Sequence, residues 1–349
     1  MRGACLIIII FILGCESSET SHQPSKPYLV GTTTFEIESE GRLLPVQLWY
    51  PSSEDEALIG IEQFEVGERR DILTSLLGAL ENDCPLTQMR VSLNAASFLS
   101  PKARPVVIFS HCHSCVRFSS FSTAQLLAQQ GYIVAAPDHI GDTLYDELDG
   151  NTGLLNNESL QIRANDISKV LDVVLSGHPD IPENLNPDEN KVGVFGHSFG
   201  AVTTGLVLQT DGRFTGGVAI AAPIENPLIP GVSVDAQTHP ILYLVAMEDN
   251  SITEFGNTLI RQNYERHPVE TWKLEVQDAG HWSFSDICGL TPSLMPGCGT
   301  ATRQTNANES VTYVNNQRAR DIAAAVVLNF FDYHFGGDLI ALQHLENGV

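Results

Sequence analysis

A serine between two glycines is the residue best placed to do chemistry in this sequence. Gly196-His197-Ser198-Phe199-Gly200 follows the apolar run 192–195 and precedes 201–208, which can continue as a helix. Such a turn between a strand and a helix holds its serine in a strained backbone conformation with the hydroxyl exposed. The helix dipole favours negative charge at the same point. The pattern predicts that Ser198 is an acyl-transfer nucleophile, and a glycine-rich turn without chemistry is the alternative.

An acid and a base follow two later predicted strands. Asp249 comes directly after 241–246, and His281 comes directly after 271–277. The chain order of serine, aspartate and histidine is that of a catalytic triad, in which the histidine takes the proton of the serine and the aspartate orients the imidazole. A histidine that only caps a glycine turn is the alternative for His281. The alternative acids are Glu248 and Glu225.

The loop after the apolar run 106–109 supplies the rest of the predicted site. An oxyanion needs two backbone N–H donors, and we expect them from Phe199 and from His113. The same loop holds soft metal ligands, which are His111, Cys112, His113 and Cys115. Adjacent residues on a tight loop do not readily form the four-ligand tetrahedron of zinc, and no second ligand pair follows. We therefore expect neither a metal nor a cofactor.

Alternating strands and helices from residue 105 onward must position these residues. The predicted strands are 106–109, 132–136, 192–195, 216–222, 241–246 and 271–277. The predicted helices are 119–130, 157–175 and 321–333. The alternation predicts an α/β fold with a doubly wound, mainly parallel sheet. Ligands bind beyond the carboxyl ends of the strands in such sheets, where the candidate residues fall.

The region before residue 105 is of a different kind. The alternating segments 28–38 and 43–50 predict two antiparallel edge strands. Residues 52–104 form an insertion, with a helix predicted over 69–80. Its mixed amphipathic character suits a flap over the site, and a surface insertion without a role is the alternative.

Charge and composition exclude some classes of partner. The 349 residues carry a formal net charge of −23 and are 43% hydrophobic. So acidic a chain argues against nucleic acid and against docking on anionic lipid. Neutral or zwitterionic small-molecule substrates remain open, and the oligomeric state does not follow from the sequence.

The first residues indicate export. Arg2 precedes the apolar run 6–13, which predicts a signal peptide over 1–14. Ile12-Leu13-Gly14-Cys15 is similar to a bacterial lipobox, so we expect a lipid on Cys15, and an ordinary signal peptide is the alternative. Residues 15–28 cannot build a core and indicate a tether. The protein would then be secreted, or held at the cell envelope by the lipid anchor alone.

Disulfides are expected in an exported chain. Cys288 and Cys298 bracket a Gly/Pro-rich loop and are the easiest pair. Cys84 with Cys112 or Cys115 is plausible, which would leave one odd thiol. The connectivity does not follow from the sequence.

With these residues in view, the chain resembles the α/β-hydrolase superfamily. Within it, the chain is similar to the group of platelet-activating-factor acetylhydrolases, dienelactone hydrolases and polyester-cleaving cutinases. The segments that carry the resemblance are Phe109-Ser110-His111 with Arg117-Phe118-Ser119, Pro137-Asp138-His139, 163–166 with 170–172, and 196–201 with Asp249 and His281. The chain departs from the acetylhydrolase loop at Cys112 and Ser114, where that loop has glycine. A dienelactone hydrolase would have cysteine at position 198.

The resemblance implies one α/β-hydrolase domain over 29–349, with 52–104 inserted. It implies an exported serine carboxylic-ester hydrolase without a cofactor that acts on short-chain acyl esters. The short acyl chain of a phospholipid and an ester polymer are both candidate substrates. A serine peptidase or amidase on the same fold, and a non-catalytic binding protein, are the alternatives.

Overall fold

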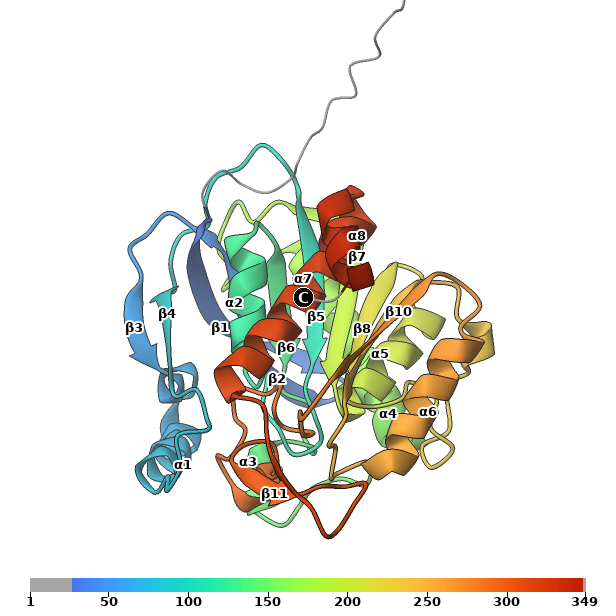
Figure 1. Ribbon diagram of the computed structural model, residues 1–349. Helices are drawn as coiled ribbons and strands as arrows, with labels where there is room; N and C mark the ends of the chain where they lie inside the picture. The colour runs from blue at the N-terminus through green and yellow to red at the C-terminus, as the bar shows by residue number, and fades with distance from the viewer. Residues whose placement is uncertain (1–26, 348–349) are drawn as a thin grey trace, which may run out of the picture.

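A ten-stranded sheet forms the centre of the molecule (Figure 1). The computed structural model describes residues 27–347, and the order of strands across the sheet is β10-β9-β8-β7-β5-β6-β2-β1-β4-β3. The strands are β1 Leu29–Ser39, β2 Arg42–Ser52, β3 Ala57–Gly60, β4 Gln88–Leu93, β5 Arg104–Ser110, β6 Ile133–Pro137, β7 Pro187–His197, β8 Gly216–Ile220, β9 Ile241–Ala246 and β10 Thr271–Val276. A separate hairpin pairs β11 Thr300–Thr302 with β12 Ser310–Thr312.

The half of the sheet from β6 to β10 is parallel. β5 pairs with β6 and β7, and the series continues through β8 and β9 to β10. The residues of β6, β8 and β9 are all buried, as expected for parallel strands that are covered on both faces. The predicted α/β fold with a mainly parallel sheet is confirmed.

The prediction that the first two strands lie at an edge is wrong. β1 and β2 pair antiparallel along their whole length, and β2 also pairs antiparallel with β6. The other side of β1 is occupied by β4, which runs parallel to it, and β3 pairs with β4. The insertion therefore extends the sheet: β4 pairs with the start of β1 at Gly31 and Thr32, and β3 pairs in turn with β4.

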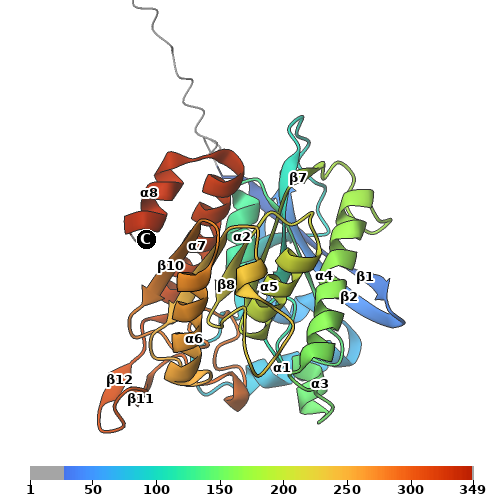
Figure 2. The ribbon, with the colours of Figure 1, turned by 90° about the vertical axis from the view of Figure 1, so that its right-hand side faces the viewer.

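Helices cover both faces of the sheet, and each face has its own hydrophobic core (Figure 2). One layer contains α2 and α7, which pack against each other, and the opposite layer contains α4, α5 and α6. The helices are α1 Gly67–Gly78, α2 Phe121–Gln129, α3 Leu144–Leu148, α4 Asn157–Ser176, α5 Phe199–Thr210, α6 Thr253–Arg266, α7 Asn316–Gly336 and α8 Leu339–Asn347. In the described range, no helix combines the length and apolar character that a bilayer span requires.

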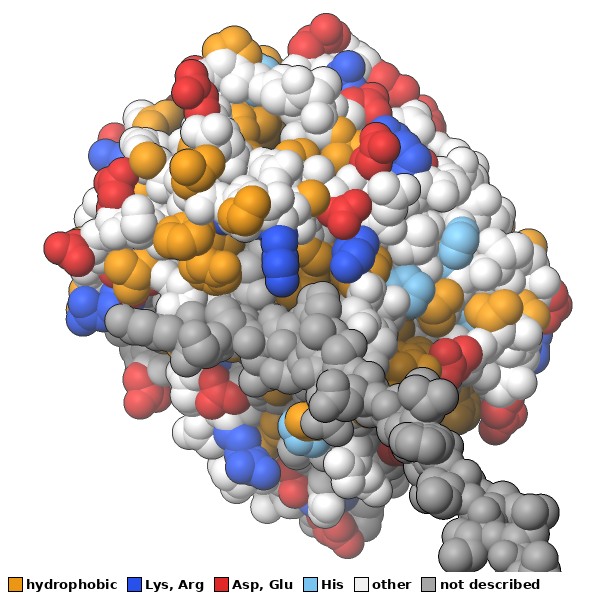
Figure 3. All heavy atoms as spheres, turned by 90° about the horizontal axis from the view of Figure 1, so that it is seen from above, with side chains coloured by type: hydrophobic (Ala, Val, Ile, Leu, Met, Phe, Trp, Pro, Cys, Tyr) orange, Lys and Arg blue, Asp and Glu red, His pale blue; other side chains and the backbone are white. Residues whose placement is uncertain are grey.

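The described chain begins at the amino ends of the parallel strands. β1 is antiparallel to β2 and β2 is antiparallel to β6, so β1 runs in the direction of the parallel set. Figure 3 shows the molecule from that end, where hydrophobic, acidic and basic side chains are interspersed. The predicted signal peptide, Cys15 and most of the predicted tether lie outside the described residues.

Candidate active site

The nucleophile turn has the strained geometry that its sequence predicts. Ser198 stands between β7 and α5 with φ 56° and ψ −119°. A side chain on Gly196 would collide with the backbone of Gly200, and one on Gly200 would collide with the carbonyl group of Ser110. Both glycines are required because the turn packs directly on itself and on the end of β5.

The structure brings the three predicted triad residues together. Ser198 Oγ lies 2.8 Å from His281 Nε2, and His281 Nδ1 lies 2.7 Å from Asp249 Oδ2. The other carboxylate oxygen of Asp249 accepts hydrogen bonds from the backbone N–H groups of Ser251 and Ile252, both at 2.9 Å. These bonds fix the aspartate, so that one oxygen faces the imidazole. The arrangement is that of a serine nucleophile, a general base and an orienting acid.

Neither alternative acid reaches His281 among the interactions of the described residues. Glu248 is turned to Arg303, and its Oε2 accepts the backbone N–H of Gln304 at 2.9 Å. Glu225 pairs with Arg266 at 2.6 Å. The sequence could not separate Glu248 from its neighbour Asp249, because only the direction of each side chain distinguishes them.

Both expected oxyanion donors are open at the catalytic cavity. His113 and Phe199 line the same cavity as Ser198. Within the described residues, neither backbone N–H has a hydrogen-bond acceptor. The two N–H groups are therefore not used elsewhere and remain candidates for oxyanion stabilisation.

The catalytic cavity has a volume of about 440 Å³ and is mostly apolar. Val202, Ala222 and Ile229 contribute to its wall. Its mouth carries exposed apolar side chains, which are Leu155, Leu228 and Phe255. No residue of the insertion 52–104 lines this cavity, so the expectation that the insertion is a flap over the site is not met.

A buried charged network holds the loop that follows β5 and carries His113, called the oxyanion loop below. Arg163 donates to the carbonyl oxygen of His111 and pairs with Asp142 at 2.5 Å. Asp142 also contacts His113 Nδ1. Burial alone would raise the pKa of Asp142, but Arg163 and His113 outweigh it and lower that pKa to about 2. The carboxylate therefore stays ionised at neutral pH.

A second Ser–His–Asp array lies within this network. Ser110 Oγ is 3.0 Å from His139 Nε2, and His139 Nδ1 is 3.0 Å from Asp166 Oδ2. All three side chains are buried, and Arg163 donates to Ser110 Oγ at 3.2 Å. Burial, with the charge of Arg163, holds the pKa of His139 well below its ordinary value. The array has no access to substrate and serves to anchor the loop.

The disulfide pairing differs from the predicted one. Cys288 is a buried free thiol, while Cys298 is bonded to Cys84. The reason is packing of the insertion against the loop after His281: Asn82 Nδ2 donates to the carbonyl oxygen of Gly289 at 3.2 Å, which places Cys84 near Cys298. The second disulfide joins Cys112 to Cys115. These two sulfur atoms are therefore not thiolate ligands for a metal.

Two further contacts at the triad have no recognisable pattern in the sequence. Arg303, in the β11–β12 hairpin, pairs with Glu248 and, at 3.2 Å, with Asp278. It thereby joins the loop of the acid to the loop of the base. His197 lies under the site, and its Nε2 is 2.9 Å from the carbonyl oxygen of His281. Burial and the neighbouring His281 lower the pKa of His197 to about 3.

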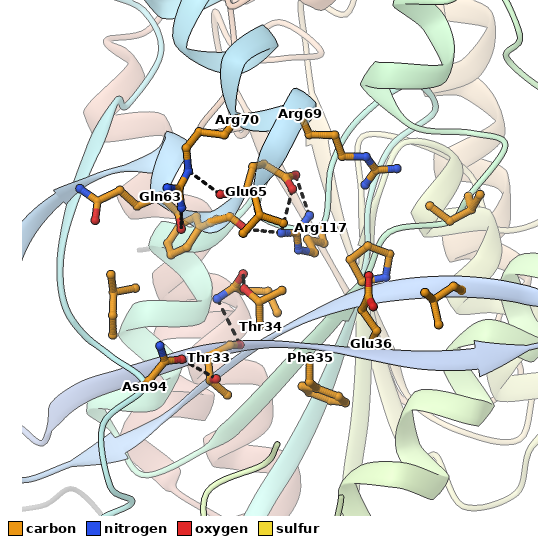
Figure 4. A pocket seen from close by; sticks show the side chains of 17 residues that line it. Thr33, Thr34, Phe35, Glu36, Gln63, Glu65, Arg69, Arg70, Asn94 and Arg117 are labelled. Carbon is orange, nitrogen blue, oxygen red and sulfur yellow. Dashed lines mark hydrogen bonds and ion pairs between the residues drawn. The ribbon is translucent and has the colours of Figure 1, made fainter. Parts of the chain in front are cut away.

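A larger cavity, of about 710 Å³, lies away from the triad (Figure 4). The close-up shows Arg69, Arg70 and Arg117 above the strand that carries Thr33 and Thr34. The arginines are engaged: Arg69 pairs with an aspartate, Arg70 donates to backbone carbonyl groups, and Arg117 pairs with buried Glu65. This cavity is where the insertion meets the sheet, and it contains no part of the triad.

Comparison with known proteins points to ester hydrolases. The family model described as platelet-activating factor acetylhydrolase, isoform II, matches residues 13–146, and that of the prolyl oligopeptidase family matches residues 117–228. The chain is 26% identical over 335 residues to a platelet-activating factor acetylhydrolase of Bos taurus, which covers 82% of this chain and 73% of the relative. It is 26% identical over 197 residues to a probable 1-alkyl-2-acetylglycerophosphocholine esterase of Arthroderma benhamiae, over 52% of this chain and 49% of the relative.

A solved structure shares the architecture. Ferulic acid esterase from Streptomyces cinnamoneus superposes with a TM-score of 0.68 at 21% identity, over 90% of this chain and 92% of that one. The fold, the elbow and the triad geometry define the class of this protein as an α/β-hydrolase. Within that class it is similar to the platelet-activating-factor acetylhydrolases, and it is a serine ester hydrolase.

Proposed function

We propose that the protein hydrolyses short-chain acyl esters through an acyl-enzyme on Ser198. The observation that carries the proposal is the unbroken contact from Ser198 through His281 to Asp249, at the wall of an apolar cavity. His281 accepts the serine proton as Oγ attacks the acyl carbon, and returns it to the leaving alcohol. The backbone N–H groups of His113 and Phe199 stabilise the oxyanion. Water then releases the acid by the same steps.

The cavity supports a short acyl group. Its volume of about 440 Å³ is at the small end of ligand pockets. The exposed apolar side chains at its mouth suit an alcohol portion that is itself partly apolar. An amphiphilic ester, such as a glycerophospholipid with a short acyl chain, combines both features. The names of the acetylhydrolase relatives point the same way.

The test is turnover of p-nitrophenyl acetate, butyrate and octanoate by the wild-type protein and by Ser198→Ala. We expect acetate and butyrate to be cleaved much faster than octanoate, and Ser198→Ala to lose activity by at least a thousandfold. Equal rates in the two proteins would refute the nucleophile. A p-nitroanilide of the same acyl group tests the peptidase alternative, which the match to the prolyl oligopeptidase model favours; faster amide than ester cleavage would establish it.

We also propose that the protein is exported and carries a lipid on Cys15. The N-terminal sequence is the basis, and the two disulfides of the described residues suit an oxidising compartment. Cells that express the full chain should incorporate radiolabelled palmitate into it, and Cys15→Ala should abolish the label. Equal labelling of both forms would exclude lipidation at this cysteine.

A further inference from the structure

The turn that carries His113 is closed by a disulfide. Residues 112–115 form a four-residue turn in which the backbone N–H of Cys115 donates to the carbonyl oxygen of Cys112 at 3.3 Å. Ser114, the third residue, has φ 56°. A turn with positive φ at its third residue normally has glycine there. Ser114 therefore holds a conformation that its side chain disfavours.

The chain on both sides of His113 is hydrogen-bonded to the rest of the protein. The backbone N–H of Ser114 donates to Asp142 at 3.2 Å, and the carbonyl oxygen of Cys115 accepts the N–H of Leu144 at 2.9 Å. Upstream, the carbonyl oxygen of His111 accepts from Arg163. Within the described residues, the N–H of His113 has no such acceptor, and His113 lines the cavity that also contains Ser198.

The disulfide spans this turn from its first residue to its fourth. The Cα atoms of Cys112 and Cys115 are 5.2 Å apart, and both side chains are completely buried. A bond between these positions excludes conformations in which Ser114 relaxes to negative φ by moving residues 112 and 115 apart. Such relaxation would rotate the peptide units on both sides of His113, and with them its N–H.

We propose that the Cys112–Cys115 disulfide is a positioning element of the catalytic site, which holds the His113 N–H in register with Ser198. The inference rests on the proposed esterase function. The bond fixes a turn that lacks glycine at position 114. Through the His113 N–H, the bond favours stabilisation of the oxyanion, which exists only in the transition state and in the tetrahedral intermediates. It does not affect binding of the unreacted substrate.

The test removes the bond while keeping the backbone. In Cys112→Ala/Cys115→Ala we expect kcat for p-nitrophenyl acetate to fall ten- to a hundredfold, with KM within twofold of wild type, because interactions made only in the transition state change kcat. The inhibition constant of an alkylboronic acid, which forms a tetrahedral adduct on the serine, should rise by a similar factor.

Two further variants separate positioning from general loosening. Cys84→Ala/Cys298→Ala removes the other disulfide and should keep kcat within about twofold when assayed well below its melting temperature. Adding Ser114→Gly to the Cys112→Ala/Cys115→Ala protein should recover most of the lost kcat, because glycine adopts positive φ without strain. Amide hydrogen exchange over residues 110–118 should be faster in the double variant and slower again with the added glycine.

The outcomes are distinct. A double variant with wild-type kcat overturns the proposal, and so does a loss that Ser114→Gly fails to recover or that Cys84→Ala/Cys298→Ala reproduces. If the wild-type protein itself cleaves no ester, or if Ser198→Ala is equally active, the proposed function has failed. The hydrogen-exchange comparison still decides in that case whether the disulfide holds the turn.

Discussion

At the scale of single residues, the site depends on side chains and backbone that would be unfavourable elsewhere. Ser198 has a left-handed backbone, and two glycines without room for a side chain make that conformation possible. Asp249 is fully buried and is satisfied by two backbone N–H groups and the imidazole of His281. Such unfavourable local conformations persist at active sites because the surrounding structure enforces them.

Replacing the acid should affect the chemistry and leave the substrate affinity intact. We expect Asp249→Asn to lower kcat by about four orders of magnitude, because an amide favours the wrong imidazole tautomer. KM should change little. Glu225→Gln removes the rejected alternative acid and serves as the control, with kcat within twofold of wild type. The opposite ranking of the two variants in steady-state kinetics would reassign the acid.

His197 should make the protein sensitive to acid. Its pKa is about 3 in the folded protein, against an ordinary 6.5, so the unfolded chain takes up a proton between these values and the folded protein does not. Stability is therefore full above pH 6.5 and is lost as the pH falls toward 3. Between pH 7 and pH 4.5 the loss from this group is about 3 kcal/mol.

Urea unfolding at the two pH values measures this dependence. In His197→Gln, whose amide can still donate to the carbonyl oxygen of His281, the loss should be smaller by about that amount. Buried His111 and His139, whose pKa values are also held low, leave a remaining dependence in the variant. An unchanged difference between pH 7 and pH 4.5 would show that His197 takes no part.

The reactive residues could be predicted from the sequence, but the residues that hold them in position could not. Ser198, Asp249 and His281 each follow an apolar run, and the carboxyl ends of parallel strands meet at one edge. Arg303 and His197 carry no such pattern, because a contact between a hairpin and a distant loop depends on packing. The pairing of Cys84 with Cys298 was missed for the same reason: it depends on how the insertion folds back on the loop after His281.

At the scale of elements, the β11–β12 hairpin connects the loop of Asp249 to the loop of His281. Arg303 joins the loop of Asp249 to that of His281 through Glu248 and Asp278, and Gln304 Nε2 donates to the carbonyl oxygen of Met247 at 3.0 Å. The backbone N–H of Val314 also donates to the carbonyl oxygen of Asp278 at 2.8 Å. The hairpin thus constrains the distance between acid and base.

Removing the ion pairs of Arg303 should lower kcat strongly and the melting temperature only slightly. We expect Arg303→Met to reduce kcat about tenfold, because small displacements of catalytic groups carry large rate penalties. The melting temperature should fall by only a few degrees. Arg266→Met is the matched control, since Arg266 also bridges two carboxylates, Glu225 and Asp235, but away from the triad. Equal kcat in the two variants would show that the hairpin does not position the triad.

At the scale of the whole molecule, the fold class follows from alternation of strands and helices, whereas the full width of the sheet does not. The strands β5 to β10 were all predicted, although β7 begins five residues before its apolar run, at Pro187. β3 and β4 are short, and they lie in a segment whose composition suggested a surface insertion. The pairing of β4 with β1 is a non-local contact that local patterns do not specify.

The Cys84–Cys298 bond should be the larger contributor to global stability. It joins residues 214 apart in the sequence and ties the insertion to the segment that leads into β11. For a loop of that length the chain-entropy model gives about 5 kcal/mol as an upper value, against about 2 kcal/mol for the four-residue loop of Cys112–Cys115. Denaturant unfolding of the two double alanine variants should show this order, and the reverse order would contradict the entropic account.

The direction of β1 has a consequence for how an anchored form would meet its substrates. Leu29 lies at the amino ends of the parallel strands, and the catalytic cavity lies beyond their carboxyl ends. An attachment through the N-terminal segment would hold the enzyme by the side remote from its cavity. The active site would then be directed toward the surrounding medium, and the enzyme would process esters that arrive from outside in preference to the lipids of its own membrane.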